Sequence, residues 1–231
     1  MSHLSEAIQA LDEALDNAVE ELKQAARRDD KTKLLNGMAL EQDAMQVGTD
    51  PTSPDVVVFG DLNRFKQIND QHGHNIGDVA LGEAGVLISK HFTDCMTAAY
   101  RRSGDEFVIV LRKDALDVFN QKAALFDSCE LPLERKVVLF SMSFGYACTD
   151  AEDAPDFNTL LDRAEQACLH AKLLGDGKCV EWTAAMNADA RVPLRSRCPA
   201  CDARISCDIA ETKVPEPRRL RICPACEARL P

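Results

Sequence analysis

The sequence lacks any apolar run of the roughly 20 residues that a membrane-crossing helix needs. Its first residues also lack the basic-then-apolar pattern of a secretory signal, and the chain contains neither internal repeats nor low-complexity tracts. We therefore expect a cytoplasmic protein without a membrane partner. With 45% hydrophobic and 28% charged residues, its composition is that of an ordinary globular protein.

Basic residues are scarce in most of the chain, which has a formal net charge of −11. The exception is the segment 191–231, where nine Lys and Arg accompany five Asp and Glu, against 18 and 33 in the rest of the chain. The acidic body argues against a protein that wraps nucleic acid, whereas the basic tail leaves a small polyanion site open.

The ten cysteines fall into two groups. Four of them form two Cys-x-x-Cys pairs separated by 21 residues, Cys198 with Cys201 and Cys223 with Cys226. This spacing predicts a structural zinc ribbon over 191–231, because four thiolates can fold a proline-rich segment that has no core of its own. A redox pair or disulfides are the alternatives. The other six show no pairing pattern and are expected to be reduced thiols: Cys95, Cys129, Cys148, Cys168, Cys179 and Cys207.

Arginines flank the expected ribbon at 195, 197, 218, 219 and 221. They fit either a ribbon that docks on a protein partner or one that binds nucleic acid, and a solvated basic surface is the simpler interpretation.

Residues 1–28 are predicted to form an amphipathic helix. Their apolar residues follow a strict four-three spacing at Leu4, Ile8, Leu11, Leu15, Ala18, Leu22 and Ala25. Such a seam is suited to a coiled-coil dimer. The alternative is a helix that packs back on its own domain, since three heptads with alanine at two seam positions make a weak coiled coil.

Residues 29–183 are predicted to form one α+β sheet domain in which strands and helices alternate. The expected strands are Asp55–Phe59, Thr97–Arg102, Glu106–Leu111, Lys136–Ala147 and Cys179–Trp182. The expected helices are Gly77–Phe92, Asp114–Cys129 and Phe157–Leu174.

Two acidic positions stand out in this domain. Asp61 follows the apolar run Val56–Phe59 and is expected at the carboxyl end of a strand, where it is either a ligand-binding residue or a helix cap. Asp105 and Glu106 lie at the exit of a tight turn, which is either part of a metal site with Asp61 or a solvated hairpin.

Several motifs resemble those of the GGDEF family in their order and spacing. The first is Asp61-Leu62-Asn63-Arg64-Phe65-Lys66-Gln67-Ile68-Asn69-Asp70, followed by Gly73-His74 and Gly77-Asp78. The second is the signature turn Ser103-Gly104-Asp105-Glu106-Phe107, in which serine replaces the first glycine. Later motifs lie at 141–145 and 164–172. The resemblance covers about residues 26–182.

The resemblance implies a central antiparallel sheet flanked by helices, similar to the palm of polymerases and adenylyl cyclases. It also implies a diguanylate cyclase, which joins two GTP molecules into cyclic di-GMP and acts as a homodimer because each domain holds one GTP. By the same resemblance, Asp61, Asp105 and the Leu62 carbonyl bind Mg²⁺ or Mn²⁺, two ions per half-site. Asp105 and Glu106 are the catalytic residues, and Glu106 assists the attacking 3′-hydroxyl.

The remaining implied positions bind the substrate. Asn69 and Asp78 read guanine, and the carboxylate suits the N1–H and N2–H₂ donors of that base. Lys66 and Lys172 hold phosphates. Further substrate contacts are implied for Phe65, His74, Ser103 and Gly104.

Some positions depart from the family pattern. Ser103 is expected to resist a left-handed backbone by about 1 kcal/mol, although its hydroxyl can hydrogen-bond locally. Asp176 replaces a basic residue and is expected to repel a triphosphate, with Lys178 as a substitute cation. The segment Asp29-Asp30-Lys31-Thr32-Lys33-Leu34-Leu35-Asn36-Gly37 differs at three positions from the pattern Asp-x-Leu-Thr-Gly-Leu-x-Asn-Arg, and it lacks the salt-bridging arginine.

Two hypotheses therefore remain. The carboxylates and base-reading residues favour an active cyclase. Ser103 and Asp176 favour a catalytically silent module that binds GTP or cyclic di-GMP and docks on a partner.

Overall fold

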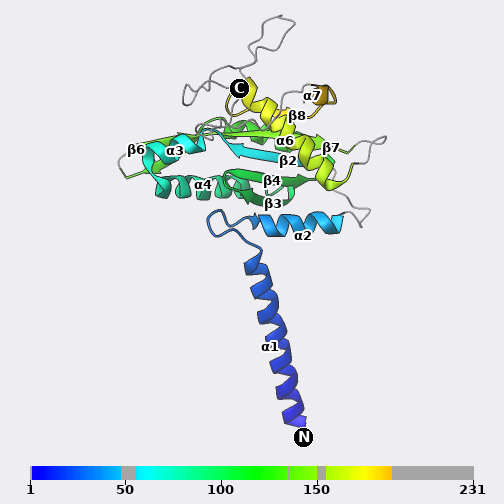
Figure 1. The fold of residues 1–231 in the computed structure, drawn as a ribbon. Coiled ribbons are helices and arrows are strands. Elements are labelled where there is room, and N and C mark those ends of the chain that lie inside the picture. The colour runs from blue at the N-terminus through cyan, green and yellow to red at the C-terminus, as the bar shows by residue number, and fades with distance from the viewer. Residues whose placement is uncertain (1, 48–55, 135, 150–154, 189–231) are drawn as a thin grey trace, which may run out of the picture.

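The computed structural model describes residues 2–47, 56–134, 136–149 and 155–188 (Figure 1). The predicted zinc ribbon, with Cys198, Cys201, Cys223 and Cys226, lies outside the described residues, as do Cys207 and Asp55.

A mixed sheet of six strands, in the order β1-β3-β4-β2-β7-β8, forms the centre of the domain. The strands are β1 (Leu35–Asn36), β2 (Val56–Leu62), β3 (Met96–Ser103), β4 (Glu106–Leu111), β7 (Met142–Cys148) and β8 (Cys179–Glu181). Pairs among the four inner strands are antiparallel, and the two short edge strands pair in parallel. The expected α+β class with a largely antiparallel sheet is confirmed.

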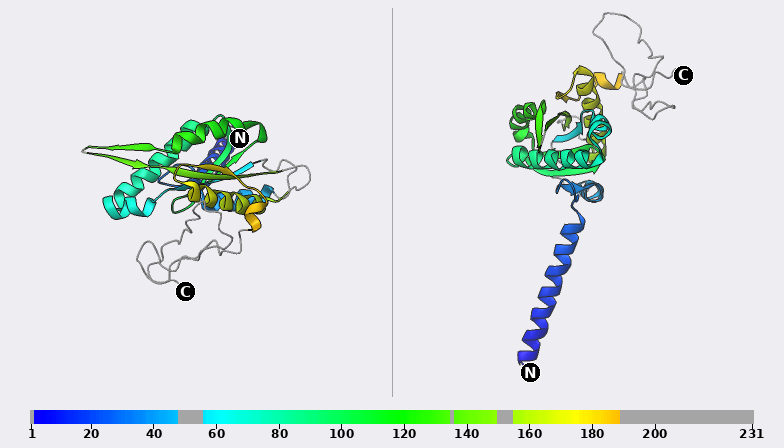
Figure 2. Two further views of the ribbon diagram at one scale, coloured as in Figure 1. Left: turned by 90° about the horizontal axis from the view of Figure 1, so that it is seen from above. Right: turned by 90° about the vertical axis from the view of Figure 1, so that its left-hand side faces the viewer.

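Strand β2 is buried along its whole length because helices cover both faces of the sheet (Figure 2). Val56 and Val58 pack with buried residues of α4 (His74–Phe92) and α5 (Leu116–Ala123). Val57 and Phe59 pack on the other side with residues of α2 (Gly37–Val47) and α6 (Phe157–Leu174). A run of apolar residues without polar alternation is typical of a strand buried on both sides.

Two predicted elements are wrong in extent. The strand expected over 136–147 is interrupted at Ser141, which separates β6 (Lys136–Phe140) from β7; β6 pairs instead with β5 (Cys129–Leu133) in a second, two-stranded sheet. The interruption has a physical reason, since the Ser141 carbonyl accepts a hydrogen bond from the Asn63 amide at 2.9 Å.

The helix expected over 114–129 is three shorter pieces: η1 (Lys113–Ala115), α5, and η2 (Ala124–Phe126), after which Cys129 begins β5. Phe119 and Phe126 both pack against Phe92 and Phe144, so the apolar pattern does not mark where the backbone changes. Three further helices were not predicted: α2, α3 (Phe65–His72) and α7 (Ala185–Ala188).

Helix α1 (Ser2–Ala26) projects away from the sheet domain (Figures 1 and 2). Three leucines of its predicted seam are exposed: Leu11 (69%), Leu15 (61%) and Leu22 (71%). The alternative in which this helix packs back on its own domain is therefore wrong for this structure, and the described part of the chain offers no partner to the three leucines. No helix among the described residues is both long and apolar enough to cross a membrane.

Candidate active site

The carboxyl end of β2 and the signature hairpin lie side by side. Asp61 is buried and pairs in register with Glu106 across the β2–β4 ladder, and the Leu62 amide donates to the Asp105 carbonyl at 3.2 Å. Asp61 does not cap a helix, because α3 begins at Phe65 with Arg64 as its N-cap and has no side-chain cap. The sheet thus brings the three residues expected at the metal, Asp61, Leu62 and Asp105, together with Glu106.

Lys172 reaches this point from α6 and forms an ion pair with the Asp61 carboxylate. A buried carboxylate requires a compensating cation, and in this structure the lysine ammonium supplies it. Within the described residues no cluster of three or more His, Cys, Asp or Glu side chains gathers around a point. The oxygens present, two carboxylates and a backbone carbonyl, are nevertheless of the kind that a hard cation such as Mg²⁺ prefers.

The signature turn is a two-residue hairpin, because Ser103 and Glu106 are paired and Gly104 with Asp105 forms the turn. Gly104 has a φ of 50°, so it takes the left-handed conformation that glycine adopts without a steric cost. Ser103 is not among the described non-glycine residues with positive φ, and the expected backbone cost at Ser103 was wrong. The Ser103 hydroxyl donates a hydrogen bond to Glu106 Oε2 at 3.0 Å. This is the kind of local hydrogen bond that was expected of it.

Arg101 links the hairpin to the segment that follows α1. Its guanidinium donates to the Gly104 carbonyl at 3.0 and 2.7 Å and to the Asp29 carboxylate at 2.9 Å. The family pattern has its salt-bridging arginine where this chain has Gly37, and the arginine that pairs with Asp29 here is Arg101 of β3. Burial alone would raise the pKa of Asp29, but hydrogen bonds from Thr32 and the charge of Arg101 outweigh burial and lower this pKa.

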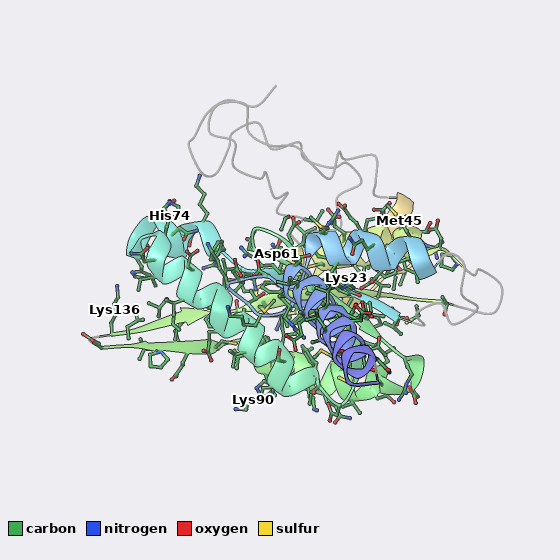
Figure 3. All side chains as sticks on the ribbon, turned by 90° about the horizontal axis from the view of Figure 1, so that it is seen from below. Lys23, Met45, Asp61, His74, Lys90 and Lys136 are labelled. Atoms are coloured by element: carbon green, nitrogen blue, oxygen red, sulfur yellow. The ribbon has the colours of Figure 1, made fainter. Side chains whose placement is uncertain are left out.

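The residues expected to read guanine meet where α3 and α4 join. A Cβ added to Gly77 would lie 1.9 Å from Asn69 Oδ1 and 3.3 Å from the Phe65 ring, so only glycine lets both side chains lie against α4 here. Asp78 follows directly and pairs with Lys31. His74 is the first residue of α4, at the end of the helix opposite Lys90 (Figure 3).

The expected phosphate end lies at the start of α3. Lys66 is in its first turn, and the uncapped backbone amides there form the positive end of the helix. The negative charge of Asp176 is compensated by Arg64, whose guanidinium nitrogen lies 3.0 Å from the Asp176 carboxylate. Arg64 thus offsets the negative charge that was expected to repel a triphosphate, and the role of Lys178 as a substitute cation stays a prediction.

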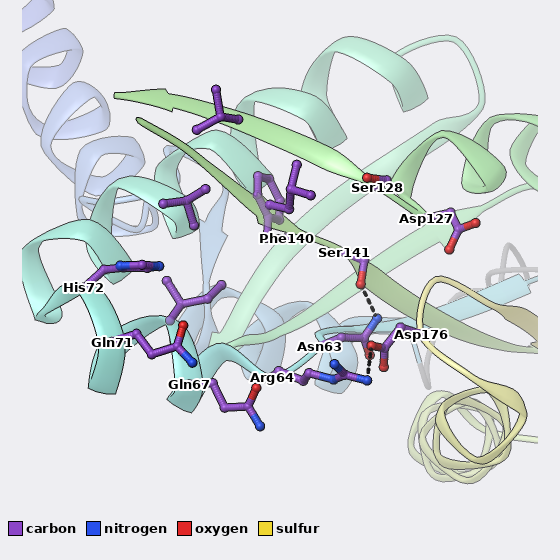
Figure 4. Close-up of a pocket in the computed structure, with 14 residues that line it drawn as sticks. Asn63, Arg64, Gln67, Gln71, His72, Asp127, Ser128, Phe140, Ser141 and Asp176 are labelled. Atoms are coloured by element: carbon purple, nitrogen blue, oxygen red, sulfur yellow. Dashed lines mark hydrogen bonds and ion pairs between the residues drawn. The ribbon is translucent and has the colours of Figure 1, made fainter. Parts of the chain in front are cut away.

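A cavity of about 370 Å³ opens beside this end of α3 (Figure 4). Its lining combines polar side chains, among them Asn63, Arg64, Ser141 and Asp176, with apolar residues of β6. Asn63 is buried here: its amide nitrogen donates to Ser141 Oγ at 2.9 Å, and its amide oxygen accepts from Ser143 Oγ at 2.9 Å. These bonds fix the loop between β2 and α3.

Sequence analysis missed the structural roles of Asn63, Arg64 and Lys31. A signal was present for Asn63, since the motif at 141–145 contains both serines that bind it. No sequence signal pairs Arg64 with Asp176 or Lys31 with Asp78, because these partners are 112 and 47 residues apart in the chain.

Replacing Asp29 by Asn tests the link between Asp29 and Arg101. We expect the free energy of unfolding at pH 7 to fall by about 1–3 kcal/mol, the usual range for hydrogen bonds to a charged group. Because the folded-state pKa of Asp29 is lowered, its contribution is present above the ordinary value of 3.8 and is lost as pH falls through the folded-state value. Urea unfolding should therefore show a difference between variant and wild type that shrinks in acid.

The neighbouring exposed residue provides the control for this experiment. Asp30→Asn should change stability by less than about 0.5 kcal/mol at either pH. Equal effects of the two substitutions would contradict a specific role for the Asp29–Arg101 pair.

Comparison with known proteins agrees with this geometry. The model of the family "Diguanylate cyclase, GGDEF domain" matches residues 26–178. The bifunctional diguanylate cyclase/cyclic di-GMP phosphodiesterase MucR of Pseudomonas aeruginosa is 32% identical over 200 residues, which cover 84% of this chain and 29% of MucR. The diguanylate cyclase DosC of Escherichia coli is 30% identical over 142 residues, which cover 58% of this chain and 30% of DosC.

The chain thus spans less than a third of either relative. Among solved structures, the isolated GGDEF domain of TpbB (YfiN) from Pseudomonas aeruginosa is 26% identical and superposes with a TM-score of 0.61, covering 71% of this chain and 99% of that domain. With a family match over most of its length, and with the hairpin and β2 arranged as described, this chain belongs to the GGDEF domain family of diguanylate cyclases.

Proposed function

We propose that the chain is a diguanylate cyclase, which condenses two GTP molecules into cyclic di-GMP by attack of each 3′-hydroxyl on the α-phosphate of the other. The observation that carries the proposal is the position of the signature hairpin: Asp105 and Glu106 lie directly beside the buried Asp61 at the end of β2. Family membership supports the same activity.

We assign the metal ligands to Asp61, Asp105 and the Leu62 carbonyl, for Mg²⁺ or Mn²⁺ with two ions per half-site. Bound there, the ions would neutralise charge on the reacting phosphate and lower the barrier to attack by a hydroxyl. Lys172 fits this scheme because its ammonium already compensates Asp61. With cations at that carboxylate, Lys172 would be available to hold a phosphate of GTP.

The triphosphate is assigned to the start of α3, where Lys66 and the uncapped amides offer positive charge and donors. Gly104 allows the backbone of the hairpin to approach the nucleotide, and the Ser103 hydroxyl holds Glu106 in place. In this arrangement Glu106 orients the attacking 3′-hydroxyl and accepts its proton. Guanine lies between Phe65, Asn69 and Asp78, close to the position of His74.

A catalytically silent binding module is the competing function. Its support came from Ser103 and Asp176, and the structure weakens both arguments. Ser103 needs no left-handed backbone, and Arg64 offsets the charge of Asp176. The active enzyme is therefore the better proposal.

A homodimer is proposed because one domain supplies only half of the reacting pair. The exposed leucines of α1 are suited to bring two domains together, since linked modules gain an effective concentration that reaches the millimolar range. The reaction is placed in the cytoplasm, in keeping with the five free cysteines in the described part of the chain, of which Cys95, Cys129 and Cys168 are buried.

The zinc ribbon remains a proposal for 191–231. The spacing of its four cysteines supports Zn²⁺, and a protein partner or nucleic acid is its proposed target.

Alanine at Asp105 or at Glu106 tests catalysis. Either substitution should lower cyclic di-GMP synthesis from GTP and Mg²⁺ by at least about a hundredfold, the scale of lost metal or acid–base assistance. Circular dichroism should be unchanged because Asp105 lies in the turn and Glu106 at the strand end beside it, and neither is part of the apolar core. Asp117→Ala, which removes an exposed acid on α5, is the matched control and should retain full activity. Full activity in both active-site variants would refute the cyclase mechanism.

The role of α1 is tested by protein dilution. Deleting residues 1–25 should lower specific activity most at low protein concentration and least at high concentration. Without the helix, two domains meet only by diffusion, and a high protein concentration makes up for the lost effective concentration. A finer variant, Leu15→Gln with Leu22→Gln, should act in the same way. The control Glu13→Gln with Glu20→Gln changes the opposite face of the same helix. Activity that matches wild type at every dilution would exclude this role.

Metal analysis tests the ribbon. We expect about one zinc per chain, because four thiolates complete a structural site. Zinc should be lost in the Cys198→Ser/Cys201→Ser variant and kept in the Cys207→Ser control, with the cyclase domain folded in both. A purified chain without zinc would contradict the assignment.

A further inference from the structure

Lys31 contacts the residue that the proposed function assigns to guanine. Its ammonium pairs with the Asp78 carboxylate, and the two side chains are 44% and 46% exposed. The pair is therefore open to solvent on one side, and a nucleotide base can reach both charges at once. The family pattern has leucine at this position, so the contact arises from a departure of this chain.

The backbone around Lys31 is held firmly against α4. The Lys31 and Thr32 amides donate to the Asp29 carboxylate at 3.2 and 2.8 Å. The Lys31 carbonyl lies against Gly82, where an added Cβ would be 3.3 Å away. Gly82 is one helical turn after Asp78 on the same face. The backbone of Lys31 is thus held beside the face of α4 that bears Asp78.

We propose that Lys31 is a specificity residue that reads the O6 atom of guanine. The proposal rests on the assignment of guanine to Asp78. When Asp78 accepts from N1–H and N2–H₂, the O6 acceptor lies next to N1–H, on the side where an ammonium beside the carboxylate can donate to it. Lysine donation to guanine O6 is a common specific contact in nucleic-acid recognition. Adenine presents an amino group at that place and would repel the lysine.

The other role open to Lys31 is that of a latch that competes with GTP for Asp78. The magnitude of the interaction decides against it. An ion pair this exposed weakens a competing ligand by at most about fivefold. The same charge placed beside a base edge separates guanine from adenine, because it attracts one and repels the other. The role in base discrimination is therefore favoured.

The test compares Lys31→Met with Lys90→Met, which removes the same charge near the far end of α4 (Figure 3). Equilibrium binding of GTP, ATP and 6-thio-GTP is measured by calorimetry, so no turnover is required. The thio analogue keeps both donors of guanine but replaces O6 by a poor acceptor. In Lys31→Met we expect GTP affinity and the preference for GTP over ATP to fall about five- to tenfold. The preference for GTP over 6-thio-GTP should disappear, and Lys90→Met should match wild type.

Two results would overturn the proposal: unchanged base preferences in Lys31→Met, or tighter GTP binding, which is the behaviour of a latch. A parallel Asp78→Ser variant separates this inference from the proposed function. If Asp78→Ser loses the preference for GTP over ATP while Lys31→Met keeps it, only the role of Lys31 is wrong. If Asp78→Ser also keeps the preference, guanine is read elsewhere, and the assigned base site fails together with Lys31.

Discussion

The buried carboxylate of Asp61 is the constraint on which the site depends. It stands at the end of a strand that is covered on both faces, so its charge must be compensated from within the protein. Lys172 provides that compensation from α6, and the β2–β4 register places the signature hairpin beside it. In the proposed function, metal ions would take the place of the Lys172 ammonium at this carboxylate. The apolar residues that make β2 a buried strand therefore also bury Asp61 at its end, and the buried carboxylate requires a cation.

A second set of hydrogen bonds connects the signature hairpin to the segment that follows α1. Arg101 joins the hairpin carbonyl of Gly104 to Asp29, and Asp29 in turn organises the short segment that bears Lys31. The Asn36 side chain donates to the Ala26 carbonyl at the end of α1. The helix proposed to pair two domains is thus linked by hydrogen bonds to the segment that contacts both the signature hairpin and Asp78.

The sequence predicted the elements that its patterns define and missed those that distant contacts define. Glu106–Leu111 and Phe157–Leu174 were predicted to the residue, because a short apolar run and a long amphipathic repeat are local signals. The break at Ser141 was missed because its cause is Asn63, far away in the chain. At the site, the family resemblance predicted that Asp61 and the signature hairpin lie together, whereas the pairs Lys31 with Asp78 and Arg64 with Asp176 depend on how helices and loops fold together. Charge pairs of this kind leave no periodicity in a sequence.

Two non-glycine residues of the described part of the chain have left-handed backbones, and one of them, Lys33, is a departure from the family pattern. Lys33 (φ 62°) stands where that pattern has glycine, and Arg64 (φ 55°) precedes α3. Each costs on the order of 1 kcal/mol and persists only where neighbours enforce it. The Lys33 amide donates to the Asp29 carbonyl, and its own carbonyl accepts from the Arg28 side chain. Arg64 is held by Asp176. Both strained positions flank the proposed nucleotide site, one beside Lys31 and the other beside the phosphate end, so the strain lies where a fixed side chain matters most.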